Sequence, residues 1–179
     1  LEDIGADCIK LGMLWSADTV RAVAKVLARY PNIPLVVDPV MVATSGDRLL
    51  DQDAVEILKA DIILRARVVT PNAREVAELT GLQVRTLSDL AAAARALVAL
   101  AAGTVVATGG DMAGDTVIDV LATGDGVEEM ASPRIDTTST HGTGCTFASA
   151  IAVGLAQNMT TRAAVVRARA YVHEAIRLA

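Results

Sequence analysis

Aromatic side chains are scarce in this 179-residue chain, which holds one tryptophan, two tyrosines and one phenylalanine. Nucleic-acid-binding proteins commonly combine such stacking side chains with a basic surface. Here 16 lysine and arginine residues face 21 aspartate and glutamate residues, which gives a net charge of −5. The composition therefore argues against a nucleic-acid partner.

Cysteines and long apolar runs are also few. Two cysteines, Cys8 and Cys145, are too few for a disulfide framework and are typical of a reducing cytoplasm. The longest apolar stretch, residues 90–107, is interrupted by Arg95 and Gly103. An arginine inside a membrane-spanning helix would cost about 2.5–3.5 kcal/mol. Since no signal peptide is visible either, we expect a cytoplasmic protein without a membrane partner.

Apolar residues are abundant, at 53% of the chain, and charged residues make up 21%. Disordered chains combine low hydrophobicity with high net charge, so this composition excludes disorder. The length fits one domain, which at this size buries roughly 70% of the surface exposed by its unfolded chain. A single globular domain with a substantial core is expected.

Strand and helix signals alternate along the chain. Ser16 is a plausible N-cap for the first helix, and Ser88 or Asp89 for an Ala-rich helix that runs through Ala102. Residues 43–50 are expected to form a loop, and helices are expected at residues 142–156 and from 161 to the end. Strands followed by helices predict a mostly parallel sheet covered on both faces. The expected strands lie at residues 7–14, 34–38, 68–70 and 104–108, with a hairpin at 117–122 and 127–131.

The most informative segment is residues 136–146, in which Gly142 and Gly144 stand where a loop becomes a helix. Glycine lets the backbone curl and approach a ligand closely. Free amides in the first helical turn, together with the helix dipole, form a site for phosphate. The same two glycines can also serve only to start a helix tightly, because a short glycine-rich turn is weak support by itself.

Cys145 lies in the same amide-rich turn. The partial positive charge of a helix N-terminus lowers the pKa of a thiol, so Cys145 is expected to be reactive and more accessible than Cys8. A thiolate beside a phosphate site can take a proton from a substrate hydroxyl. Cys8 is expected to be a buried small apolar residue. His141 is either a second candidate base or a loop residue that bonds to the backbone.

Two acidic residues follow short apolar strands. Asp38 ends one strand before Pro39, and Glu75 lies in the first helical turn after another strand. Each has an ordinary structural role available: turn formation for Asp38, and an interaction with the helix dipole for Glu75. Ligands of open α/β sheets bind at the carboxyl ends of the strands. Two carboxylates there would suit Mg²⁺ held through water and nucleotide oxygens.

Five segments of the chain match one family in order and approximate spacing. The chain resembles the hydroxymethylpyrimidine/phosphomethylpyrimidine kinases of thiamine biosynthesis, which belong to the ribokinase-like superfamily. The resemblance runs through essentially the whole chain. Its most specific segments are Asp38-Pro-Val-Met41 and the one that contains His-Gly-Thr-Gly-Cys-Thr146. The matching segments are Lys10-Leu-Gly-Met-Leu14, Asp38-Pro-Val-Met41, Thr70-Pro-Asn-Ala-Arg-Glu75, Thr108-Gly-Gly110 and Thr140-His-Gly-Thr-Gly-Cys-Thr146.

The resemblance implies a three-layer α/β/α sandwich with a mostly parallel central sheet. It implies ATP and Mg²⁺ as cofactors, with a monovalent cation as a possible addition, an aminopyrimidine alcohol or its monophosphate as substrate, and a homodimer. It also assigns roles to residues of this chain. The anion hole is Gly142, Thr143, Gly144 and Cys145, with Cys145 as the base; the metal and nucleotide residues are Asp38 and Glu75; further nucleotide contacts are Thr108 and Gly110; and the pyrimidine pocket is lined by Met13 and Val40.

The chain departs from the family in two respects. Members carry a further N-terminal segment with a strand and most polar contacts to the pyrimidine, so we interpret residues 1–179 as the C-terminal portion of one ribokinase-like domain. Such a fragment alone is expected to have little activity. The family often has lysine at Thr108 and histidine at Asp111, and a lost lysine removes a point charge from phosphate binding. A pyridoxal/pyridoxine kinase and a non-catalytic nucleotide-binding remnant therefore remain alternatives.

Overall fold

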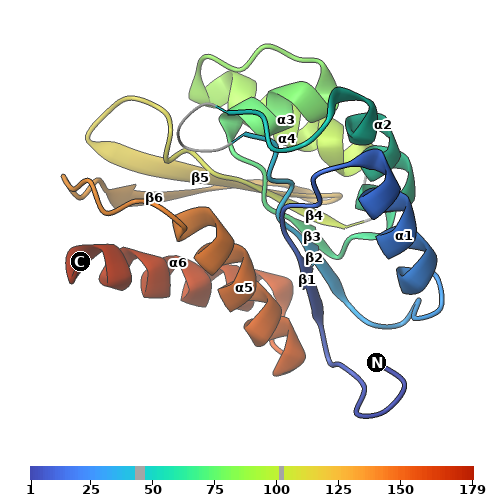
Figure 1. Ribbon diagram of the computed structural model, residues 1–179. Coiled ribbons are helices and arrows are strands. Elements are labelled where there is room, and N and C mark those ends of the chain that lie inside the picture. The colour runs from blue at the N-terminus through green and yellow to red at the C-terminus, as the bar shows by residue number, and fades with distance from the viewer. Residues whose placement is uncertain (43–46, 101–102) are drawn as a thin grey trace.

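The computed structural model describes residues 1–42, 47–100 and 103–179, and its centre is a six-stranded sheet (Figure 1). The strands lie side by side in chain order, and β1 to β4 are parallel while β5 and β6 form an antiparallel hairpin. The mostly parallel sheet and the hairpin are thus confirmed. The strands are β1 (Ile9–Leu11), β2 (Leu35–Val37), β3 (Val68–Val69), β4 (Thr104–Ala107), β5 (Thr116–Thr123) and β6 (Gly126–Pro133).

Helices cover both faces of the sheet, which gives the three layers expected (Figure 1). One layer holds α1 (Ala17–Leu27), α2 (Gln52–Asp61), the 3-10 turn η1 (Ile63–Arg65), α3 (Ala73–Thr80) and α4 (Leu87–Leu100). The other holds α5 (Thr143–Ala156) and α6 (Thr161–Arg177). Among the described residues, no helix has the length and apolar character needed to cross a membrane.

The parallel strands are apolar on both sides because each layer of helices buries one side. In β2, Leu35 and Val37 pack with α1 to α4, whereas Val36 packs with α5 and α6. The same alternation separates Val69 from Val68 in β3. Successive side chains of a strand point to opposite faces, so a strand buried on both faces becomes a continuous apolar run.

Local capping explains where several helices begin. The Ser16 hydroxyl accepts a hydrogen bond from the Thr19 amide (3.3 Å), as expected for the N-cap of α1. The expected cap of α4 is wrong. Its N-cap position is occupied by Thr86, whose amide donates to the Asp89 carboxylate (2.9 Å) while its hydroxyl accepts from the Asp89 amide (3.2 Å). This reciprocal pair is a capping box, which starts the helix at Leu87.

The first strand is shorter in the structure than expected, and parts of an expected loop and an expected helix lie outside the described residues. The first strand has three residues rather than the eight expected, and of the described strands only β2 pairs with it. Residues 43–46 of the expected 43–50 loop lie outside the described residues, as do residues 101–102 at the end of the expected Ala-rich helix.

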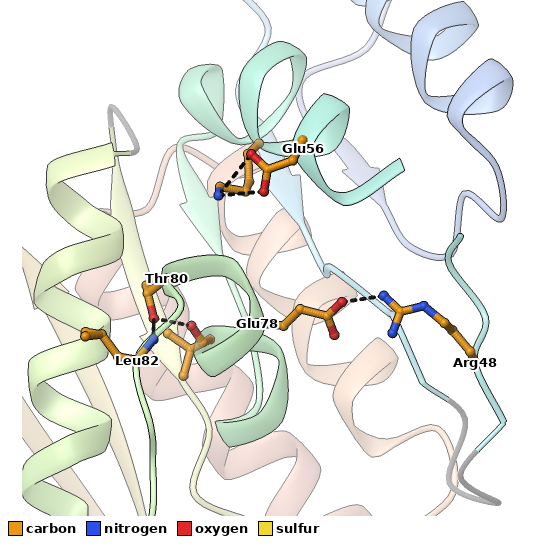
Figure 2. A network of polar contacts seen from close by, with 7 residues as sticks. Arg48, Glu56, Glu78, Thr80 and Leu82 are labelled. Carbon is orange, nitrogen blue, oxygen red and sulfur yellow. Dashed lines mark hydrogen bonds and ion pairs between the residues drawn. The ribbon is translucent and has the colours of Figure 1, made fainter. Parts of the chain in front are cut away.

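Side-chain contacts tie the loop before α2 to the adjacent helix α3 (Figure 2). Arg48 forms an ion pair with Glu78 of α3. The Thr80 hydroxyl donates to the Val76 carbonyl (2.7 Å) and accepts from the Leu82 amide (3.3 Å), which satisfies the end of α3. These contacts link the segment around Arg48 to α3 and close the C-terminal end of that helix.

Candidate active site

Charged side chains from β1 and from the end of β2 meet on the face of the sheet covered by α5. Strand alternation places Lys10 and Asp38 on the same side as Val36, which packs against α5 and α6. Asp38 is buried, and its Oδ2 atom lies 3.2 Å from Nζ of Lys10. Burial of the carboxylate is thus compensated by an ion pair within the sheet.

The N-terminus of α5 has the form of an anion-binding turn. Gly142 caps the helix with a φ of 80°, a left-handed conformation that a residue with a side chain adopts at a cost. Thr143 begins the helix, and its hydroxyl donates to the Thr140 carbonyl (2.9 Å). The amides of Gly144 and Cys145 have no acceptor within the described part of the chain. Free, exposed amides at a helix N-terminus suit a phosphate group.

Cys145 is exposed, as expected, but the pKa of its thiol is raised rather than lowered. Burial of the sulfur raises its pKa, and its hydrogen bond to Asp38 and the negative charge of that carboxylate raise it further. The ammonium group of Lys10 acts in the opposite direction. The expected lowering of the pKa is therefore wrong for the protein without ligands, because burial and the neighbouring Asp38 carboxylate both disfavour the thiolate.

Glu75 is buried at the start of α3, close to the same charges. Its Oε2 atom accepts a hydrogen bond from the Asn72 amide (2.8 Å) and its Oε1 atom one from the Met41 amide (3.4 Å). Burial raises the pKa of Glu75 to about 7, with further contributions from the charges of Asp38 and Asp111, although the two amide hydrogen bonds lower it. Glu75 therefore changes its protonation state near neutral pH.

The carboxylates of Asp38 and Glu75 could supply part of the coordination shell of a divalent cation, but not a complete one. Among the described residues, no group of three or more His, Cys, Asp or Glu side chains is arranged to hold a metal ion. Asp38 and Glu75 repel each other, and a cation between them would relieve this repulsion. Mg²⁺ typically takes one or two protein carboxylates and completes its shell with water and phosphate oxygens. The residues fit Mg²⁺ held in this shared way.

The segment that follows β4 lies next to the start of α3. Thr108 forms a parallel bridge with Asn72, and its amide donates to the Pro71 carbonyl (2.9 Å). Gly110 is exposed, and its carbonyl accepts from the guanidinium of Arg134 (2.9 Å). Thr108 therefore lies beside the capping box that contains Glu75.

The residues expected to line a substrate pocket lie at neighbouring strand ends. Met13 follows β1 and is 52% exposed, and Val40 follows β2 and is partly buried. Their role toward a substrate stays a prediction.

His141 is exposed and lines a cavity of about 140 Å³ between the α5 N-terminus and α6. Its role as a second base and its role as a loop residue both stay predictions. A cavity of about 500 Å³ lies between α3, residues 84–87 and residues 109–118.

Several residues of the site were missed as functional candidates. Lys10 had a visible signal, since it is the single charge in an otherwise apolar strand. Asp119 and Arg169 form a partly buried ion pair (2.8 Å) although they are 50 residues apart in the chain. No local sequence pattern could have paired them, because their contact depends on how α6 packs on the hairpin.

Comparison with known proteins supplies matches over the whole chain. A sequence profile described as phosphomethylpyrimidine kinase matches residues 1–179. The hydroxymethylpyrimidine/phosphomethylpyrimidine kinase of Streptomyces coelicolor is 44% identical over 98% of this chain and 65% of its own length. The chain spans less than two thirds of the length of the first curated relatives that it matches.

Two solved structures share the fold closely. A phosphomethylpyrimidine kinase from Clostridium difficile superposes with a TM-score of 0.85 at 31% identity, covering 98% of this chain and 71% of that one. The ADP complex of Bacillus subtilis pyridoxal kinase superposes with a TM-score of 0.87 at 35% identity, covering 94% of this chain and 64% of that one. The fold is therefore that of the ribokinase-like kinases.

Proposed function

Because the chain belongs to the phosphomethylpyrimidine kinase family, we propose that the protein transfers the γ-phosphoryl group of ATP to 4-amino-5-hydroxymethyl-2-methylpyrimidine and to its monophosphate, in thiamine biosynthesis. The observation that carries this proposal is the start of α5, where two free amides and the Cys145 thiol occur together beside Asp38. A phosphate site and a proton-accepting group are what transfer to an alcohol requires.

In the proposed reaction the substrate oxygen forms a bond to the γ-phosphorus of ATP while the bond to the ADP oxygen breaks. The amides of Gly144 and Cys145 bind the transferred group, and Gly142 and Thr143 shape the turn. The alcohol proton passes to Sγ of Cys145, which therefore has to be in its thiolate form. Lys10 favours that form and Asp38 disfavours it. Mg²⁺ held by Asp38 and Glu75 would neutralise negative charge on the phosphates of ATP. A monovalent cation would add to this neutralisation.

The remaining parts of the proposal rest on the family. Thr108 and Gly110 would contact the nucleotide, and Met13 and Val40 the pyrimidine ring. The protein would act as a homodimer in the cytoplasm, a compartment with which two free cysteines agree. Light scattering of the purified full-length protein tests the dimer, and a monomer at working concentrations would contradict it.

Exchange of the thiol tests the chemistry in the full-length protein. Cys145→Ser keeps the shape but replaces the thiol by an alcohol of far higher pKa, so we expect kcat to fall by about 10²–10⁴. Affinity for ATP-Mg should change little, because main-chain amides form the anion site. Cys8→Ser is the matched control and should keep full activity. Wild-type turnover in Cys145→Ser would remove the thiol from the mechanism.

A pyridoxal/pyridoxine kinase is the second candidate function. It is favoured by the similarity to Bacillus subtilis pyridoxal kinase and by Thr108 in place of the lysine expected of pyrimidine kinases. Values of kcat/KM for the pyrimidine alcohol and for pyridoxal, measured side by side, separate the two activities. Binding of ATP-Mg without turnover of either alcohol would instead indicate a nucleotide-binding remnant.

A further inference from the structure

The loop that joins β4 to β5, residues 109–114, follows directly after Thr108 and is called the glycine loop here. Most of its length is held by one side chain, that of Arg134. The guanidinium of Arg134 donates to three loop carbonyls: those of Gly110 (2.9 Å), Met112 (2.5 Å) and Gly114 (2.6 Å). Arginine suits this task because its planar fork carries five N–H donors.

The start of the glycine loop is held by a different group. The Gly109 amide donates to Oδ1 of Asp119 in β5 (2.9 Å), and Oδ2 of Asp119 binds Nε of Arg169 in α6 (2.8 Å). Arg169 also donates to the Met130 carbonyl (2.6 Å). The loop is therefore fixed at its first residue by the partly buried Asp119–Arg169 pair and along its length by Arg134.

We propose that Arg134 is a positioning residue for nucleotide binding, which holds the glycine loop in the shape that Thr108 and Gly110 need to contact ATP. This inference rests on the proposed function. Its physical basis is that a loop ordered before binding loses less conformational entropy when the ligand arrives. Arg134 itself is exposed, and its three acceptors are all main-chain groups of the loop.

Titration calorimetry of the full-length protein with ATP-Mg tests the proposal. In Arg134→Ala we expect the Kd for ATP-Mg to rise about tenfold, because the loop then has to be ordered on binding. Affinity for the pyrimidine alcohol should not change. Arg134→Lys keeps the charge but has one nitrogen in place of the three that reach the loop carbonyls, so it should show a smaller rise. This variant also decides the matter if Arg134→Ala does not fold.

Arg162→Ala is the matched control, since Arg162 is an exposed arginine that binds the Glu128 carboxylate (2.8 and 2.6 Å) rather than the loop. It should bind ATP-Mg like the wild type, and its unfolding temperature shows what loss of a surface arginine costs. Unchanged ATP-Mg affinity in the Arg134 variants that fold, or an equal loss of affinity for both ligands, would overturn the proposal. A wild-type protein that binds no ATP-Mg would instead overturn the proposed function, and this assignment with it.

Discussion

On the β1–β2 side of the candidate site, four charged or ionisable side chains crowd together, whereas on the β4–β5 side the chain presents mainly its backbone. The first group is Lys10, Asp38, Glu75 and Cys145, called the thiol–carboxylate cluster here. Asp38 raises the pKa of Glu75, and both carboxylates raise the pKa of the Cys145 thiol. The second side is the glycine loop, whose hydrogen bonds to Arg134 and Asp119 are already made.

Under the proposed function, the two sides would receive the anionic, metal-bearing ligand in different ways. In the thiol–carboxylate cluster, Asp38 is already paired with Lys10, and a bound cation would relieve the repulsion that remains between Asp38 and Glu75. The glycine loop is instead shaped in advance, so that little ordering is left for the ligand to cause. Changes in the loop should therefore alter stability or affinity, and changes in the cluster should alter pH dependence and reactivity.

Of the predictions that follow, the largest effect is expected for a substitution in the glycine loop. A Cβ atom at Gly109 would lie 2.1 Å from the Ile118 carbonyl oxygen, a backbone atom that cannot move aside cheaply. Gly109→Ala should lower the free energy of unfolding by about 1–3 kcal/mol, measured by urea denaturation. Gly110→Ala is the matched control, because no atom lies within 4 Å of its added carbon. Equal stability of the two variants would contradict close packing of the loop on β5.

A pH-dependent effect is expected in the cluster. The pKa of Glu75 is raised from 4.5 to about 7 by folding, so the folded protein binds more protons than the unfolded chain between those values. The free energy of unfolding of the wild type, relative to Glu75→Gln, should therefore fall as pH rises from about 4.5 to about 7, and then level off. Denaturation at pH 5, 6, 7 and 8 measures this difference. A difference that stays constant over this range would contradict the raised pKa.

The smallest effect concerns the reactivity of the thiol. Asp38 raises the pKa of Cys145 and Lys10 lowers it, so Asp38→Asn should speed alkylation by iodoacetamide at pH 7 and Lys10→Met should slow it. We expect changes below about tenfold, which is the effect of one pKa unit on the thiolate fraction. Cys8 is the internal control, because burial and a backbone contact set its pKa. Rates that move together at both cysteines would indicate a general loss of structure.

Much of the architecture follows from local patterns. Apolar strands that end in proline or in a polar residue, and Gly81 with its φ of 73° at the end of α3, place the elements within a few residues. The first strand was overestimated because apolar residues continue past its end, into the segment before the N-cap Ser16. The start of α4 was misplaced because Asp89, one of the two residues expected as the N-cap, is instead the partner of Thr86 in the capping box.

The sequence by itself determined the class of fold, the glycine turn that starts α5 at Gly142 and the two carboxylates at strand ends, because each depends on residues that are neighbours in the chain. Only the tertiary structure decided the direction of the pKa shift of Cys145 and the support of the glycine loop. Both depend on groups that are far apart in sequence: Asp38 lies more than 100 residues before Cys145, and Arg134 lies 24 residues after Gly110. Electrostatic fields and hydrogen bonds act through space, so these properties exist only once the chain has folded.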